Sequence, residues 1–365
     1  MRSVLAAVIA APGHAAEVRE QPVPLLEPDS ALLEVELSEV CGTDVHLRAG
    51  RLSGVPYPLI PGHVSVGRLG EIRGVVRDVD GNPLHEGDRV TFLDVHRTCN
   101  ACWYCLVARA TTRCPQRRVY GITYGAVDGL AGGWAQAVYL KPGTRIIPLQ
   151  AVPPETFMAG GCSLPTALHA MELARIQMAD TVLVLGSGPV GLSAVTLARM
   201  SGAGSVFCIG APAERLAAAH TVGAAGTVDI SIASPEERLA WVLAMTGGRG
   251  ADVTIEATGA PEAVVEAMRF TRDAGRVIVV GQYTDHGDVG FNPHADLNRK
   301  HLEVRGCWGS DYSHFHRAVR LLQDPDRAAA WESLHLDSYS LANANEALNA
   351  VEAGSVVKAL IDPRM

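Results

Sequence analysis

The hydrophobic residues of about the first 150 positions fall in short runs that turn residues interrupt. Three such runs are Leu32–Leu37, Ser65–Leu69 and Arg89–Leu93, and Gly and Pro are frequent between them. Short apolar runs bounded by turn residues are typical of β-strands. The pattern therefore predicts an irregular, loop-rich β-domain over the first part of the chain.

The pattern changes near Pro153, and from Thr181 onward short apolar runs alternate with longer segments of helical periodicity. Predicted strands are Thr181–Leu185, Val206–Ile209, Asp252–Ile255 and Arg276–Val280. Predicted helices are Val190–Met200, Ala213–His220, Pro235–Met245, Pro261–Arg272, Ser313–Leu322 and Ala342–Ala353. Strands that alternate with helices build a doubly wound parallel sheet, so the second part predicts an α/β domain.

Length and charge narrow the class of protein. A chain of 365 residues corresponds to about two domains. The net charge is −8 and no block of basic residues occurs, which argues against nucleic acid as a partner. No apolar run reaches the roughly 18 residues that a membrane span needs.

The start of the chain allows two interpretations, because Met1-Arg2 precedes the apolar run Val4–Ala11. This could be a signal peptide or a first β-strand. The very short polar start and the lack of a cleavage site favour the strand. We therefore expect a cytoplasmic protein whose partner is a small molecule.

The turn after the first predicted parallel strand matches G-x-G-x-x-G and consists of Gly186, Ser187, Gly188, Pro189, Val190 and Gly191. An ordinary glycine-rich turn is the alternative, but the position between a strand and a helix favours a dinucleotide site. Gly186 permits the tight turn, Gly188 lets the backbone approach a pyrophosphate, and Gly191 lets helix and strand pack closely. The helix N-terminus then binds the pyrophosphate.

The residues at the end of the next strand indicate whether the site prefers NAD or NADP. An acidic residue there would bind the ribose 2′-hydroxyl of NAD, but Val206–Ile209 is followed by Gly210. The first carboxylate is Glu214, and Arg215 could fold back towards a 2′-phosphate. The sequence predicts that NADP is tolerated and preferred.

Cysteines cluster in one short segment. Within sixteen residues lie Cys99, Cys102, Cys105 and Cys114. Four thiolates at such spacing are typical of a structural zinc site. A disulfide pair or an iron–sulfur cluster is the alternative, and a zinc-ribbon nucleic-acid module is disfavoured because few basic residues flank the cysteines.

Three further candidate ligands are dispersed: Cys41 in Cys41-Gly42-Thr43-Asp44-Val45-His46, His63 after Gly62, and Cys162 after Gly160-Gly161. Taken singly, each could be an ordinary packing residue. Spacing alone does not join them into one site.

With these segments in order, the whole chain resembles the zinc-containing medium-chain alcohol dehydrogenases. The resemblance extends to Gly87-Asp88-Arg89-Val90, Gly132-Gly133-Trp134-Ala135 and Glu256-Ala257-Thr258-Gly259. It implies a GroES-like catalytic β-domain, residues 1–160 and 302–365, with an inserted Rossmann domain, residues 161–301. It also implies NAD or NADP as cofactor and a homodimer or homotetramer.

The resemblance assigns roles to single residues. Cys41, His63 and Cys162 would bind a catalytic zinc and leave a fourth position for water or substrate. Asp44 would orient the zinc-bound histidine. The proton relay from the alcohol to solvent would consist of Thr43 and His46. Residues beside the nicotinamide would be Thr166, Val280 and Gln282.

Two positions depart from the family pattern. Many relatives have Glu after the zinc-binding histidine, where this chain has Val64, which puts the exchange of ligands at zinc in doubt. The gap from Cys105 to Cys114 is one residue longer than in many relatives, which a loop can absorb.

The same alignment gives limited clues to the substrate. Val95 stands where relatives that take simple alcohols have a bulky aromatic residue, Gln282 replaces an apolar one, and Trp308 lies nearby. These residues suggest a roomy secondary alcohol that is cyclic or polyhydroxylated, although they could merely pack. Competing functions are a zinc-independent enoyl or quinone reductase of the same superfamily and a non-catalytic zinc-binding protein.

Overall fold

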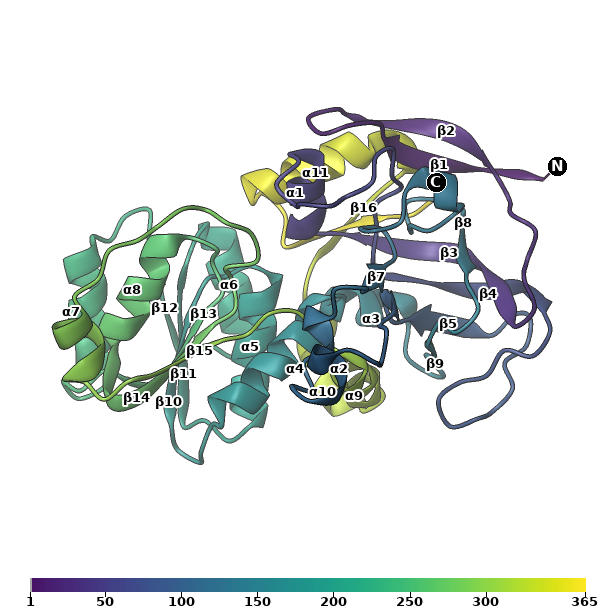
Figure 1. Ribbon diagram of the computed structural model, residues 1–365. Coiled ribbons are helices and arrows are strands. Elements are labelled where there is room, and N and C mark those ends of the chain that lie inside the picture. The colour runs from purple at the N-terminus through teal and green to yellow at the C-terminus, as the bar shows by residue number, and fades with distance from the viewer. Residues whose placement is uncertain (1) are drawn as a thin grey trace. The chain divides into compact units, whose positions relative to one another are not determined.

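The computed structural model describes residues 2–365 and divides into two compact units (Figure 1). Unit 1 comprises Met1–Cys162, Asp311–Ala328 and His335–Met365. Unit 2 comprises Ser163–Ser310 and Ala329–Leu334.

Unit 1 is built on a seven-stranded sheet in which β16, β17, β3, β4, β5 and β9 are neighbours in that order and β8 also pairs with β3. Its strands are β3 (Ser30–Val40), β4 (Ser65–Arg73), β5 (Arg89–Phe92), β8 (Ala137–Leu140), β9 (Ile146–Pro148), β16 (Leu336–Tyr339) and β17 (Lys358–Ile361). Two further ladders join β1 (Ser3–Ile9) to β2 (Ala16–Pro22) and β6 (Val95–Arg97) to β7 (Arg118–Val119). The apolar run Val4–Ala11 is therefore a strand, as predicted, although β1 begins one residue earlier and ends two residues earlier than that run.

Strand β3 is buried along almost its whole length because both of its faces are covered. Leu32 and Val40 belong to one apolar cluster, which also includes residues of β1 and helix α11 (Ala344–Ala353). Leu33 and Val35 point the other way, into a cluster with Phe92. Successive side chains of a strand alternate between faces, so a continuous apolar run serves two cores at once.

The C-terminal segment of the chain completes unit 1. Strand β17 pairs with β3, and α11 packs against α1 (Gly42–Arg48) and β17. Figure 1 shows this yellow segment beside the purple N-terminal strands. The remaining helices of the unit are α2 (Trp103–Leu106), α3 (Pro154–Gly160) and α9 (Tyr312–Leu322), and α10 (Pro325–Glu332) spans the boundary near residue 328.

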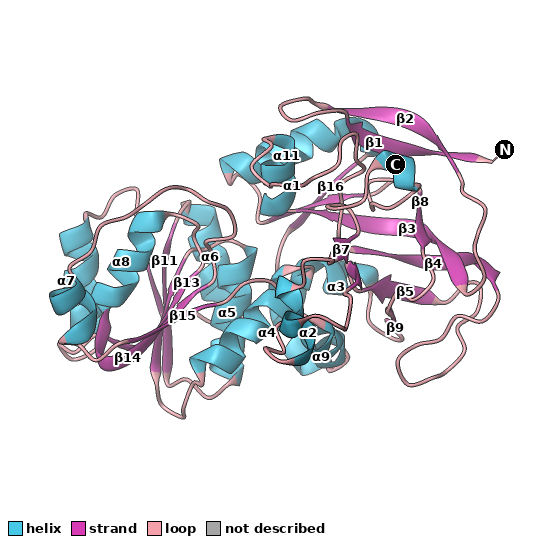
Figure 2. Cartoon of the chain, in the orientation of Figure 1, coloured by secondary structure: helices cyan, strands magenta, loops and turns pink. Residues whose placement is uncertain are grey.

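Unit 2 is a six-stranded parallel sheet in the order β12, β11, β10, β13, β14, β15. The strands are β10 (Thr181–Leu185), β11 (Ser205–Gly210), β12 (Gly226–Asp229), β13 (Ala251–Glu256), β14 (Thr271–Val279) and β15 (Glu303–Gly306). The helices are α4 (Ser163–Ala174), α5 (Pro189–Met200), α6 (Ala213–Thr221), α7 (Pro235–Met245) and α8 (Pro261–Phe270). Figure 2 shows α7 and α8 on one side of the sheet and α4 and α5 on the other.

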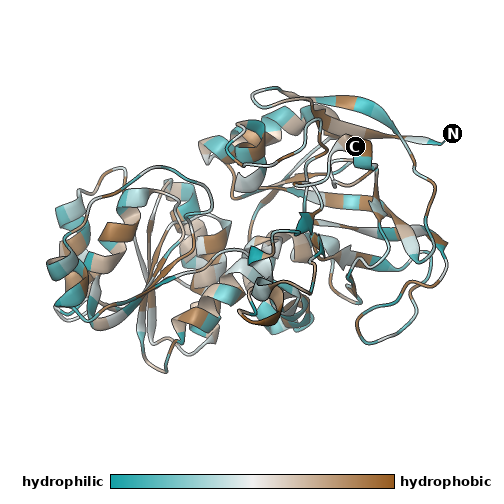
Figure 3. Ribbon diagram, in the orientation of Figure 1, coloured by the Kyte–Doolittle hydropathy of each residue, from teal (hydrophilic) through white to brown (hydrophobic). Residues whose placement is uncertain are grey.

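The strands of this parallel sheet are apolar because helices cover both of its faces. Figure 3 shows hydrophobic residues along the strands, whereas the outer helix α7 is polar in its first turn, at Glu236, Glu237 and Arg238. The predicted α/β alternation is confirmed for the strands and helices that the sequence indicated, whereas β12, β15 and α4 were not predicted individually. Two adjoining boundaries were wrong: the helix predicted to reach Arg272 ends at Phe270, and the strand predicted to start at Arg276 begins at Thr271, which already pairs with Ala251 of β13.

The unit boundaries differ from the expected domain limits at residues 160 and 302. Cys162 belongs to unit 1, whereas β15 belongs to unit 2 because it pairs with β14. Ala329–Leu334 returns to unit 2, where the Trp331 indole N–H donates to Ser193 Oγ at 3.2 Å. Among residues 2–365, no helix has the length and apolar character needed to cross a membrane.

Truncation of Leu33 in the core of unit 1 should destabilise the protein strongly. Leu33 is fully buried, and Leu→Ala changes at such positions cost about 2–5 kcal/mol. We expect Leu33→Ala to lower the urea midpoint of the transition that unfolds unit 1. Leu25→Ala, at a side chain that is 92% exposed, is the matched control and should leave the midpoint unchanged. Equal midpoints for the two variants would contradict this assignment of the core.

Candidate metal centres and cofactor site

Cys41, His63 and Cys162 come together in unit 1, although they are far apart in the sequence. One ligand atom from each lies within 4.8 Å of the other two, and Cys41 Sγ is 3.9 Å from His63 Nε2. Bond lengths of about 2.3 Å to sulfur and 2.0 Å to nitrogen in a tetrahedral zinc site place such atoms about 3.6 Å apart. The three residues therefore fit zinc with one coordination position left over.

The local backbone fixes Cys41 at the point where β3 ends and α1 begins. Its thiol caps the helix by accepting the Thr43 N–H at 3.3 Å, and Asp44 accepts the Cys41 N–H at 2.9 Å. This reciprocal capping box satisfies backbone donors of the first turn. The thiol is thus held at a helix N-terminus, which favours negative charge.

Asp44 acts on this centre differently from the expected contact with the histidine ring. Its buried carboxylate accepts the backbone N–H groups of Cys41 and Gly62, at 2.9 and 3.4 Å. His63 Nδ1 has no hydrogen-bond partner among residues 2–365. Asp44 therefore positions the backbone of Cys41 and the residue before His63, and it acts on the imidazole by charge alone.

The protonation of the three groups suits a cation. The interaction with the neighbouring Cys162 lowers the pKa of Cys41 well below its usual value, and the same interaction, followed by burial, raises the pKa of Cys162. Burial opposes a charge on His63, but Cys41, Asp44 and Asp94 together outweigh it and raise the pKa of His63 to about 10. Without metal, the site thus holds a thiolate, an imidazolium and a thiol.

Thr43 and His46 lie three residues apart on α1, and both are partly buried. Residues at this spacing lie on the same face of a helix. Thr43 and His46 follow Cys41 by two and five residues, in the helix that begins directly after this candidate ligand.

Sequence reasoning missed two charged residues at this centre, Glu39 and Lys358. Both side chains are buried, and Glu39 contacts Cys162. The sequence offered a signal for Glu39, which is a charged residue within an apolar strand and stands two positions before the candidate ligand Cys41.

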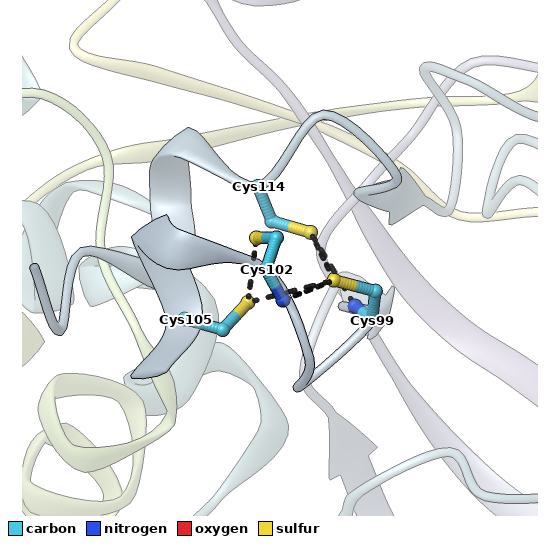
Figure 4. A group of neighbouring side chains, drawn as sticks. All are labelled: Cys99, Cys102, Cys105 and Cys114. Atoms are coloured by element: carbon cyan, nitrogen blue, oxygen red, sulfur yellow. Dashed lines mark hydrogen bonds between the residues drawn. The ribbon is translucent and has the colours of Figure 1, made fainter. Parts of the chain in front are cut away.

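The four clustered cysteines converge as predicted (Figure 4). Cys102 and Cys105 Sγ lie 3.6 Å apart, as do Cys114 and Cys99, and Cys99 to Cys105 is 4.0 Å. A zinc–sulfur tetrahedron has sulfur–sulfur distances of about 3.8 Å, so the four atoms fit zinc. The Ala101 N–H, followed by weaker donors, lowers the pKa of Cys99 to about 6, which favours a thiolate. The cluster contains no disulfide.

The glycine-rich turn in unit 2 has the geometry that close approach requires. Gly186 has φ +109°, and a Cβ there would lie 2.6 Å from Ala257 O. A Cβ on Gly191 would lie 1.8 Å from Gly186 O. Gly188 caps α5 and faces open space, and Pro189 occupies the first helical turn. The helix N-terminus is thus accessible to an anion.

The end of β11 has no room for the acid that NAD sites usually carry. A Cβ on Gly210 would lie 2.5 Å from Ser187 Oγ, and that hydroxyl donates to Ala211 O at 3.0 Å. Arg215 lies in the first turn of α6, where burial lowers its pKa.

The remaining candidate residues lie in both units. Thr166 is a partly buried residue of α4, Val280 is buried just after β14, and the Gln282 amide donates to Ala260 O at 3.1 Å. Trp308 stacks on Tyr283 with ring centroids 5.5 Å apart. Val95 is buried in β6. Cys208 and Cys307, which sequence analysis left unassigned, are buried packing residues.

Two segments of the chain match known protein families. Residues 27–151 match the alcohol dehydrogenase GroES-like domain, and residues 189–324 match the zinc-binding dehydrogenase domain. A 5-exo-hydroxycamphor dehydrogenase from Pseudomonas putida is 32% identical over 93% of this chain and 94% of its own length. D-arabinitol dehydrogenase 1 from Uromyces fabae is 27% identical over 93% of this chain and 92% of its own length.

Solved structures agree with these matches. An alcohol dehydrogenase from Thermotoga maritima has a TM-score of 0.92 at 30% identity and covers 99% of this chain and 100% of its own. A zinc-binding dehydrogenase from Sinorhizobium meliloti 1021, solved bound to NADP, has a TM-score of 0.84 at 28% identity and covers 100% of both chains.

Metal analysis should separate the two centres. We expect two zinc ions per chain in the wild type, because each ligand set is complete for its type of site. Cys41→Ser should retain one zinc and lose all turnover. Cys102→Ser should lose the other zinc and lower the midpoint of thermal unfolding. Mass spectrometry of the native protein would count the metals, and a full complement in either variant would contradict the assignment.

Metal binding at the three-residue centre should be strongly pH-dependent. His63 and Cys162 are protonated in the metal-free site, so zinc displaces about two protons and its affinity falls by about 100-fold per unit of falling pH. Calorimetry at pH 7 in buffers of different ionisation enthalpy would count the protons. Release of no proton would contradict the ligand set.

Proposed function

Because this chain belongs to the zinc-binding alcohol dehydrogenases and is thus an NAD(P)-dependent oxidoreductase acting on alcohols, we propose that its substrate is a roomy secondary alcohol, cyclic or polyhydroxylated. The observation that supports this class is the small side chain of Val95, which is buried at the position where the family alignment suggests a bulky aromatic residue. The relatives named for hydroxycamphor and arabinitol are consistent with it.

In the proposed reaction, Cys41 Sγ, His63 Nε2 and Cys162 Sγ hold the zinc. When bound, zinc would supply a Lewis acid to the alcohol oxygen, and the oxidised nicotinamide would supply the acceptor for the hydride. Thr43 Oγ takes the hydroxyl proton in a hydrogen-bonded chain, and His46 passes it towards solvent. Imidazole suits this step because its ordinary pKa lies near neutrality.

The preferred cofactor in this proposal is NADP. Gly210 packs against Ser187, so no carboxylate at this position repels a 2′-phosphate. Arg215 lies two residues into α6 and offers a positive charge close to that strand end. The relative solved with NADP is consistent with this preference.

We further propose a homodimer or homotetramer in the cytoplasm. Three apolar side chains on α2 and directly after it are exposed by about three fifths, and a second copy would cover them. They are Trp103, Leu106 and Val107. The eight free thiols suit a reducing compartment.

The test of substrate class is a nicotinamide absorbance assay on zinc-replete protein with primary, secondary, cyclic and polyhydroxylated alcohols. We expect the highest kcat/KM with cyclic or polyhydroxylated secondary alcohols. Gln282→Leu should lower kcat/KM for polyols while sparing purely apolar alcohols, because it removes a polar group. Highest efficiency with small primary alcohols, or an unchanged Gln282→Leu profile, would contradict the proposed pocket.

Arg215→Ala tests the cofactor preference. The substitution removes a positively charged partner of the 2′-phosphate of NADP, and a charge-assisted hydrogen bond is worth about 1.5–3 kcal/mol. It should therefore raise KM for NADP about tenfold or more and leave KM for NAD unchanged. Arg199→Ala is a control at a surface arginine, which bonds to Gly223 O at the far end of α5. Equal effects of Arg215→Ala on both cofactors would refute the role.

A further inference from the structure

Glu39 and Lys358 form an ion pair in the interior of unit 1. Lys358 Nζ donates to Glu39 Oε1, and the two side chains are only 1% and 2% exposed. Lysine and glutamate are almost never buried to this extent unless they are paired, because removal of a charge from water is costly. A pair of this kind therefore requires a reason beyond packing.

Strand register places both side chains on one face of the sheet. Glu39 N donates to Val64 O at 3.0 Å, and the β3–β4 register puts Glu39 directly opposite Val64. Leu360 of β17 pairs with Glu39 on its other side, so Lys358 is the diagonal neighbour of Glu39. Opposite and diagonal residues of antiparallel strands share a face. This chain has Val64, and therefore no acid, directly after His63. The carboxylate on that face of the strand pair comes instead from Glu39 on the neighbouring strand.

The Glu39 carboxylate contacts one of the metal ligands at two atoms. It accepts the Cys162 backbone N–H through Oε2 at 2.7 Å and the Cys162 thiol through Oε1 at 3.3 Å. Lys358 binds that same Oε1. The direction of the Cys162 side chain is therefore set by a carboxylate that is itself held by an ammonium group.

Gly161 leaves the space that the pair fills. It has φ +46°, and a Cβ there would lie 2.3 Å from Glu39 Oε2 and 2.6 Å from Lys358 Nζ. No side chain fits at this position without displacement of the pair. The glycine before Cys162 and the two charged residues are thus one structural unit.

We propose that Glu39 and Lys358 are positioning residues of the catalytic metal centre, which fix the Cys162 thiolate and balance its charge. The proposal rests on the assignment of Cys162 as a metal ligand, not on the identity of the alcohol. When Cys162 binds metal it gives up its thiol proton, which leaves a thiolate beside the carboxylate of Glu39. The ammonium of Lys358 offsets the repulsion between these two anions.

Two single substitutions disturb this balance in opposite directions. Glu39→Gln keeps a hydrogen-bond acceptor for the Cys162 N–H but leaves the Lys358 ammonium unpaired. The unpaired ammonium then competes with the metal for the Cys162 thiolate. Lys358→Met leaves the carboxylate unpaired beside the thiolate. We expect each variant to bind metal about 10- to 100-fold more weakly at this centre, the usual effect of removing a group that supports a ligand.

The double variant Glu39→Gln/Lys358→Met removes both charges at once. Because neither residue is then left unpaired, the loss of metal affinity should be smaller than the sum of the two single effects.

The experiment is cobalt substitution of the full-length protein. Absorbance from thiolate-to-cobalt charge transfer reports how Cys41 and Cys162 bind the metal, and the spectrum of Cys41→Ser is subtracted to remove the four-cysteine site. We expect altered bands in both single variants and faster cobalt loss to a chelator. Glu266→Gln, at the Arg238–Glu266 pair in unit 2, is the control and should keep the wild-type spectrum.

Wild-type spectra and wild-type chelator rates in both single variants would overturn the proposal, even if their thermal stability fell, since the pair would then be purely structural. If the single variants fail to fold, Glu39→Asp carries the test: it keeps the charge but withdraws the carboxylate from Cys162. An unchanged spectrum there would also overturn the proposal. Altered spectra in a protein that oxidises none of the alcohols would support this inference and refute the proposed substrate class.

Discussion

The end of strand β3 is the point on which the metal centre depends. Val40 is the last residue of the strand, Cys41 caps α1, and Asp44 holds the Cys41 N–H from within the first turn. Strand β4 lies beside it, with His63 two residues before its start, and β17 completes the other side. Because both faces of β3 are packed in separate apolar clusters, its register cannot shift without exposing one of them. A rigid strand end thus positions ligands from remote parts of the sequence.

The periodic parts of the fold could be predicted from the sequence. The parallel strands of unit 2 are continuous apolar runs, and their helices begin at proline or at capping residues such as Ser234. Unit 1 could be predicted only as a loop-rich β-domain, because its pairing joins β17 to β3 across more than 300 residues. Local patterns carry no information on contacts of that range.

The residues of the candidate site likewise include some that the sequence could indicate and some that it could not. The four cysteines and the glycine-rich turn have local spacing, so the sequence indicated them directly. Cys41, His63 and Cys162 could be joined only by family resemblance, and the structure brings them within 4.8 Å of one another. The charge of Glu39 within an apolar strand was visible in the sequence, but its partnership with Lys358 was not, since that partnership depends on strand register. The contacts of Asp44 with the Cys41 and Gly62 backbone are likewise tertiary details that no motif specifies.

Unit 1 contains two separate ligand sets, which we assign to two zinc centres of different kinds. Anomalous diffraction from crystals of the purified protein, measured on both sides of the zinc absorption edge, tests this assignment most directly. We expect two peaks per chain, one enclosed by four cysteine sulfurs and one bound by Cys41, His63 and Cys162 with a non-protein ligand in its fourth position. Absence of a peak at the three-residue centre, or a fourth protein ligand that closes it, would contradict the account.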